Sequence, residues 1–170
     1  SLQSIDQWAT TSAVYGIETN VSALGALQNL VSPKDLDLFG MSAKASYWVE
    51  RFLSTEALIQ LKEFAATLHN VDAILCETLF TVAYGIGLKK DNVAMQDVPV
   101  VLRAHNVEHR IQERLANQAK GVATNTYRKY LAKTTKDFEI DAVNRADLVA
   151  AISPDDASAF TELGTSAKVQ

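Results

Sequence analysis

The chain has 170 residues, of which 48% are hydrophobic and 21% charged, and its formal net charge is −4. This size and composition suit one globular domain with a substantial core, whereas the acidic balance argues against nucleic acid as a partner. The sequence contains neither a bilayer-spanning apolar run nor a signal peptide, and its one cysteine, Cys76, cannot form an internal disulfide. We therefore expect a cytoplasmic protein in which Cys76 is buried and inert.

The first third of the chain predicts mainly helices and loops. Residues 13–18 read as a short strand, residues 21–30 as a helix that ends before a Ser-Pro turn, and residues 33–41 as a loop. Residues 47–52 fit either an extended segment or a helix start. Ser54 then has the character of an N-cap, and apolar residues follow it at helical spacing.

Three short apolar runs further along the chain predict strands that alternate with helices. The expected strands are residues 71–76, 98–104 and 148–152. The expected helices are residues 79–88, weakened by Gly85 and Gly87, residues 107–115, residues 126–145, and a last one from Ser153 to Leu163. The alternation predicts an α/β fold with a parallel, doubly wound sheet, and the Val-rich second strand is expected to be buried on both faces.

Polar residues follow each predicted strand. Glu77 follows the first strand, His105 and Asn106 the second, and Ser153 the third. Parallel strands bring their carboxyl ends to one edge of the sheet, where ligands bind in open α/β folds, so this edge is the candidate site. Arg103 lies inside the apolar second strand, and we expect a carboxylate beside its buried guanidinium.

Several of these polar residues also have a structural interpretation. Asn106 and Ser153 suit the N-caps of the following helices, with Asp156 placed as in a capping box after Ser153. Glu108 lies in a first helical turn, where the helix dipole stabilises a negative charge. Glu77 reads almost equally well as a solvated carboxylate at a strand end.

A zinc peptidase is a minor alternative. His105, Glu108 and His109 form H-x-x-E-H, the signature of one class of zinc peptidases. Zinc ligation there requires both histidines on one face of a single helix. The strand that precedes His105 places it before the helix, which argues against this interpretation.

The central sequence resembles a known enzyme family. The segments that carry the likeness are VDAILCE at residues 71–77, PVVLRAHNVEH at residues 99–109, AVNRAD at residues 142–147 and LVAAISPDD at residues 148–156. In this order they resemble the amino-terminal domain of glycosyltransferase family 4, the retaining enzymes of the GT-B fold. The likeness covers roughly residues 47–170.

The resemblance implies a Rossmann-like acceptor domain. Members of the family have two such domains facing a cleft, of which the carboxy-terminal one binds the nucleotide sugar and the amino-terminal one the acceptor. Residues 1–170 would then form a single partial domain that lacks the first strand, its Gly-rich loop and the donor-binding domain, and that is inactive alone. The intact enzyme would move a sugar from a nucleotide sugar to a glycan, lipid-linked or small acceptor without metal or cofactor, and peripheral membrane association would be compatible with that role.

The resemblance also implies roles for individual residues. It places His105 near the transferred sugar as the catalytic candidate, a hydrogen-bonding group that helps to stabilise the transition state. Glu77, Asn106, Glu108 and Ser153 are the candidate substrate-binding residues, and no metal ligand is expected. The alternative to an enzyme is a non-catalytic α/β binding or interaction module. Such a module would hide an open sheet edge by forming a homodimer.

Overall fold

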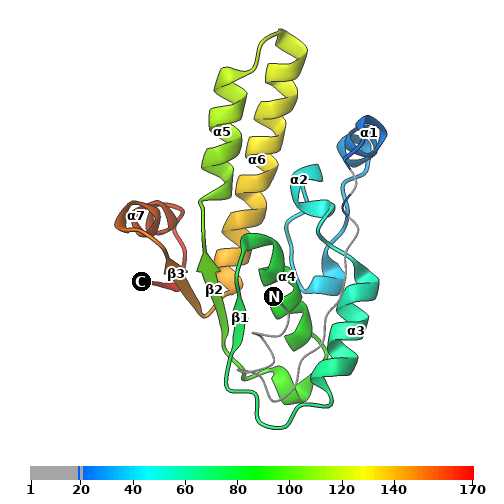
Figure 1. The fold of residues 1–170 in the computed structure, drawn as a ribbon, viewed down its shortest axis with the longest axis vertical. Helices are drawn as coiled ribbons and strands as arrows, with labels where there is room; N and C mark the ends of the chain where they lie inside the picture. The colour runs from blue at the N-terminus through cyan, green and yellow to red at the C-terminus, as the bar shows by residue number, and fades with distance from the viewer. Residues whose placement is uncertain (1–18, 20) are drawn as a thin grey trace, which may run out of the picture.

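The computed structural model describes residue 19 and residues 21–170. In this part of the chain a parallel sheet is built from β1 (Ile74–Cys76), β2 (Val100–Ala104), β3 (Leu148–Ala151) and β4 (Lys168–Val169), in the order β1-β2-β3-β4. Helices connect successive strands (Figure 1). The predicted α/β fold with a parallel sheet is therefore confirmed, whereas the strand predicted at residues 13–18 lies outside the described residues.

In the described residues, three α-helices precede the sheet. They are α1 (Ala23–Val31), α2 (Tyr47–Glu50) and α3 (Thr55–Ala65), with a short 3-10 turn at Asp37–Phe39 between the first two. The hydroxyl of Ser54 accepts a hydrogen bond from the backbone N–H of Ala57, which confirms the predicted cap of α3. The ambiguous residues 47–52 begin as a helix because the Ser46 hydroxyl caps α2.

The remaining helices are α4 (Leu79–Lys89), α5 (Glu108–Gln118), α6 (Val122–Arg145) and α7 (Pro154–Glu162), with a 3-10 turn at Val93–Met95. In Figure 1, α5 and α6 form a long antiparallel hairpin that projects beyond the sheet. None of the helices in the described residues is both long and apolar enough to cross a membrane.

The sheet buries one face more completely than the other. In β2, Val100, Leu102 and Ala104 are buried, whereas Val101 is only partly covered and Arg103 is exposed. The expectation that this strand is buried on both faces was therefore wrong. Helix α4 covers β1 and β2 on the buried side, and the residues of the other face remain in contact with solvent, as in a sheet with one solvated face.

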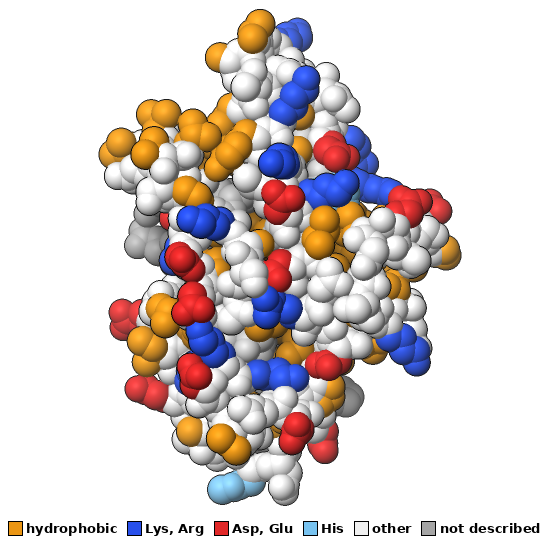
Figure 2. All heavy atoms as spheres, turned by 180° about the vertical axis from the view of Figure 1, so that it is seen from behind, with side chains coloured by type: hydrophobic (Ala, Val, Ile, Leu, Met, Phe, Trp, Pro, Cys, Tyr) orange, Lys and Arg blue, Asp and Glu red, His pale blue; other side chains and the backbone are white. Residues whose placement is uncertain are grey.

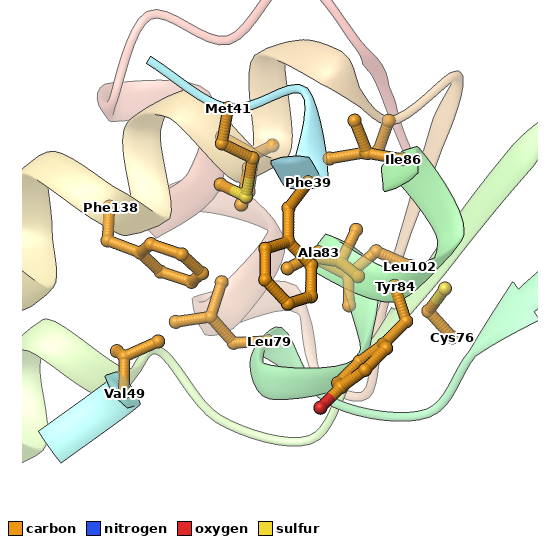
Figure 3. Packing of buried hydrophobic residues seen from close by; sticks show 14 of the residues in the cluster. Phe39, Met41, Val49, Cys76, Leu79, Ala83, Tyr84, Ile86, Leu102 and Phe138 are labelled. Atoms are coloured by element: carbon orange, nitrogen blue, oxygen red, sulfur yellow. The ribbon is translucent and has the colours of Figure 1, made fainter. Parts of the chain in front are cut away.

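The glycines of α4 bring that helix close to the sheet. A Cβ added at Gly85 would lie 2.6 Å from Cys76 Sγ, so a side chain there would force the thiol or the helix to shift. From Val82 to Leu88 every residue of α4 is buried, and Figure 3 shows Ala83, Tyr84 and Ile86 within the packed core. The glycines thus permit close packing. Burial raises the pKa of the Cys76 thiol to about 11, in agreement with the predicted inert cysteine.

Candidate functional site

Three charged or titratable side chains meet at the carboxyl ends of β1 and β2. Glu77 Oε2 accepts hydrogen bonds from Arg103 Nη1 at 3.1 Å and from His105 Nε2 at 3.2 Å. The sheet register explains the meeting, because Cys76 is paired with Leu102 and the next residues, Glu77 and Arg103, therefore lie level with each other. Side chains alternate along a strand, so His105 projects on the same side as Arg103.

This cluster of Glu77, Arg103 and His105 is open to solvent. Between 44% and 52% of each side chain is exposed. The predicted carboxylate partner of Arg103 is present, but the prediction that Arg103 is buried was wrong. The hydrogen bond from His105, together with the charge and hydrogen bond of Arg103, lowers the pKa of Glu77 below its ordinary value, against a smaller opposing effect of burial. The cluster therefore presents an ionised carboxylate that is held between a guanidinium and an imidazole.

Asn106 does not cap α5. The N-cap position is Val107, and no side chain of the cap residue bonds to the helix. The first backbone N–H groups of α5, those of Glu108 and His109, instead donate to the two carboxylate oxygens of Glu139 at 2.9 and 3.3 Å. The predicted cap was wrong because a carboxylate from α6 already satisfies these donors, and Asn106 is left exposed beside the cluster.

Glu139 also pairs with His109. The His109 Nδ1 and Glu139 Oε2 atoms lie 2.5 Å apart, with 5% of the histidine side chain and none of the glutamate side chain exposed. Sequence reasoning missed this pair because the residues are 30 positions apart. The one available signal was an acidic residue among the apolar positions of the long predicted helix, between Phe138 and Ala142, which a structural partner would explain.

Glu108 is partly buried at the start of α5. Burial raises the pKa of its carboxyl group, and the nearby Glu139 carboxylate adds to the shift. The side chains of Trp48 and Asn106 oppose the shift. Glu108 is thus a carboxyl group that holds its proton more tightly than usual, close to the exposed cluster along the chain.

Ser153 has a structural role in the described chain. Its hydroxyl accepts from the backbone N–H of Asp156 at 3.1 Å and donates to Asp156 Oδ2 at 2.7 Å. This confirms the predicted N-cap of α7, with Pro154 at the first helical position. The hydroxyl is thus held within the cap, and none of the hydrogen bonds of Ser153 in the described chain reaches the Glu77 cluster.

The histidines of H-x-x-E-H have separate surroundings. His105 lies before α5 and contacts Glu77, whereas His109 lies inside α5 and contacts Glu139. Their rings therefore do not occupy successive turns of one helix, which is the arrangement that a zinc peptidase of this type requires. Within residues 21–170 and residue 19, no group of three or more His, Cys, Asp or Glu side chains is placed to hold a metal ion.

Comparisons with known proteins found no relative of this chain. The chain matched no protein-family model, no curated protein and no solved structure.

Proposed function

We propose that this chain is the acceptor-side domain of a retaining glycosyltransferase that takes its sugar from a nucleotide-sugar donor. The observation that carries the proposal is the exposed cluster of Glu77, Arg103 and His105 at the carboxyl edge of a parallel sheet. This edge is where open α/β sheets bind ligands. The resemblance of residues 47–170 to family 4 glycosyltransferases supplies the reaction type.

The chemistry of the cluster suits the recognition of sugar hydroxyl groups. A carboxylate and an unprotonated imidazole nitrogen accept hydrogen bonds from hydroxyl groups, and the guanidinium N–H groups that are not bonded to Glu77 donate to hydroxyl oxygens. Glu77 has a second carboxylate oxygen that takes no part in the bonds to Arg103 and His105. Because the three side chains hold one another in place, little ordering is needed when a ligand binds.

His105 is the proposed catalytic residue. Hydrogen bonding from its Nε2 to Glu77 fixes the ring and favours a proton on that nitrogen. With that proton engaged by Glu77, the unprotonated Nδ1 can accept a hydrogen bond from a hydroxyl of the transferred sugar and hold the sugar in place while positive charge develops on its ring in the transition state. Asn106 and Glu108 adjoin it along the chain and are the proposed contacts to the substrate.

The first test measures ligand binding by the chain itself. We expect nucleotide sugars and a panel of saccharides to shift the NMR signals of His105 and its neighbours, and we expect His105→Ala to abolish the response. The exposed His69 supplies a matched control, because His69→Ala removes a surface histidine at a distant helix end. Saccharide binding that is unchanged in His105→Ala would contradict the assignment of the site.

The second test measures transfer. The chain alone is expected to leave nucleotide sugars intact, and turnover by it would contradict the assignment to the acceptor side. In the protein encoded by the complete reading frame, His105→Ala should lower kcat about 100-fold, the order of loss seen when one preorganised hydrogen bond to a transition state is removed. An unchanged kcat would remove His105 from the mechanism.

A second candidate function is an interaction module, and one observation favours it. Leu75 of β1 is 59% exposed, and β1 is an edge strand whose outer side pairs with no other strand of the described chain. Such edges pair readily with another chain. Light scattering at high protein concentration tests this function, since a dimer that Leu75→Glu dissociates would support it and a clean monomer would count against it.

A further inference from the structure

A polar groove lies between α5 and α7. It has a volume of about 410 Å³, and its lining includes Asn106, the residue that follows His105. In Figure 1, α7 lies near the end of α5 that joins β2. Arg110 Nη2 of α5 donates to Glu162 Oε2 of α7 at 3.0 Å, so an ion pair links the two helices. The groove therefore continues along the chain from the Glu77 cluster.

One face of α5 lines the groove. Arg110, Arg114 and Asn117 recur at helical spacing, and all three are exposed. Seven residues of α-helix extend about 10 Å, so these polar side chains cover a length greater than one pyranose ring. Asp156 contributes to the lining from the first turn of α7. The groove thus offers a row of polar groups rather than a single contact.

Several of these polar groups are available to a ligand. Within the part of the chain that the structure describes, the side chains of Glu113, Arg114 and Asn117 form no hydrogen bond or ion pair. The guanidinium of Arg110 uses one of its five N–H groups for Glu162. A ligand in the groove can therefore bond to these groups without first breaking contacts within the protein.

The charges that line the groove are balanced. Arg110 and Arg114 are accompanied by Glu113 and Asp156, and Figure 2 shows Lys, Arg, Asp and Glu side chains next to one another on the hairpin. A phosphate group would meet two carboxylates as well as two guanidinium groups, which disfavours it. A neutral ligand with many hydroxyl groups can use every side chain, because carboxylates accept hydrogen bonds and guanidinium and amide N–H groups donate them.

We propose that the α5–α7 groove is a saccharide subsite and that the acceptor is an oligosaccharide. Its terminal sugar lies at the Glu77 cluster, and the sugars that precede it lie in the groove from Asn106 toward Asn117. Ile111, which also lines the groove, supplies an apolar contact for the C–H face of a ring. This inference rests on the proposed function for the sugar at the cluster, and it adds that the acceptor is a chain of at least two sugars.

Binding of saccharides of increasing length tests the proposal. The probes are glucose, maltose and maltotriose, with mannose, mannobiose and mannotriose as a second series, and NMR spectra of the chain report binding. In at least one series the trisaccharide should bind about tenfold more tightly than the monosaccharide. The trisaccharide should shift the side-chain amide signals of Asn117, whereas the monosaccharide should leave them in place.

Substitutions in the groove separate the two parts of the site. Arg114→Ala with Asn117→Ala should weaken trisaccharide binding about tenfold and leave monosaccharide binding unchanged. The matched control is Gln118→Ala with Lys120→Ala, which removes an amide and a cation that lie outside the groove and should change neither affinity. All four residues are exposed, so their substitution leaves the core intact. Circular dichroism checks that each variant is folded.

The outcomes distinguish the groove from the proposed transfer site. Equal affinity for every length in both series would overturn the groove assignment, as would unchanged trisaccharide binding by the Arg114→Ala, Asn117→Ala variant. Monosaccharides that still shift the signals of His105 would leave the proposed function standing. A trisaccharide that shifts Asn117 but no signal near His105 would support a saccharide groove and contradict the transfer site.

Inorganic phosphate is the competing probe. If it shifts the signals of Arg114 and Asn117 more strongly than either trisaccharide does, the groove binds an anion and the proposal is overturned. The absence of any saccharide response, in the groove and at His105 alike, would overturn both the saccharide groove and the proposed function.

Discussion

The molecule contains two glutamate–histidine pairs whose histidines are only four residues apart. His109 and Glu139 lie 2.5 Å apart and are almost entirely buried, whereas His105 and Glu77 lie 3.2 Å apart with nearly half of each side chain exposed. The first glutamate comes from a helix and caps another helix. The second follows a strand and meets the end of the neighbouring strand.

This difference in burial gives the two chemically similar pairs different roles. The carboxylate of Glu139 accepts from two backbone N–H groups and one imidazole, so its oxygens are occupied and shielded from solvent. The carboxylate of Glu77 is reached by solvent and uses one oxygen for Arg103 and His105. The buried pair therefore holds α5 against α6, and the exposed pair is free to meet a ligand.

Removing the buried carboxylate should have the largest effect. Glu139→Ala leaves the start of α5 and the His109 side chain without their acceptor, and breaking such a buried pair costs roughly 3–5 kcal/mol. Urea unfolding measures the loss. Glu139→Gln keeps one acceptor oxygen and should lose less. A loss as small as that of Glu77→Ala, measured in parallel, would show that the two pairs do not differ as described.

Loss of the buried histidine should likewise cost more stability than loss of the exposed one. His109→Ala removes a hydrogen bond to a buried carboxylate and should lower the free energy of unfolding by roughly 2–3 kcal/mol. His105→Ala removes a half-exposed side chain, and its effect should stay within about 0.5 kcal/mol. Thermal and urea unfolding of both variants give the comparison. Equal losses would mean that His105 supports the fold and would weaken its assignment to a site.

Most of the exposed pair of His105 and Glu77 could be predicted from the sequence. Strands at residues 71–76 and 98–104 placed Glu77 and His105 at the same edge, and the need of Arg103 for a carboxylate pointed to such a partner. The error concerned burial, because an apolar run alone does not show how many faces of a short strand are covered. In the described chain, β2 has a solvated face, and Arg103 lies on it.

The buried pair of His109 and Glu139 could not be predicted from the sequence, for a physical reason. Asn106 has a good capping side chain next to the helix start, so local chemistry favoured it. The actual acceptor, Glu139, is supplied by the antiparallel packing of α6 against α5, which no local pattern reveals. Ser153 shows the contrast, because its cap involves Asp156 three residues later and was predicted correctly.

Glu108 provides a pH-dependent test of the buried environment. Its pKa is raised, so the folded state holds the proton more tightly than the unfolded state, and stability falls as the pH rises above the unfolded-state pKa of about 4.3. Glu108→Gln removes this penalty. The Tm should therefore exceed that of the parent chain at pH 7, and the difference should vanish near pH 4.

The exposed Glu113 on the same helix is the matched control for that experiment. Glu113→Gln should change the Tm little at either pH. A lower Tm of Glu108→Gln at pH 7 would mean that the charge of Glu108 stabilises the start of α5 more than its burial disfavours it.

The smallest effect is expected in the titration of Glu77. Its pKa is lowered, so its stabilising interactions are present at neutral pH and are lost as the pH falls through the folded-state pKa. Carbon NMR should find this carboxyl below the ordinary range, and both His105→Ala and Arg103→Ala should raise its pKa. Added salt should raise it as well, because solvent-exposed charges are screened. Salt should leave the loss of stability on Glu139→Ala nearly unchanged, since a pair shielded from water is screened far less. A loss that falls with salt as much as the pKa of Glu77 responds to it would remove the distinction between the two pairs.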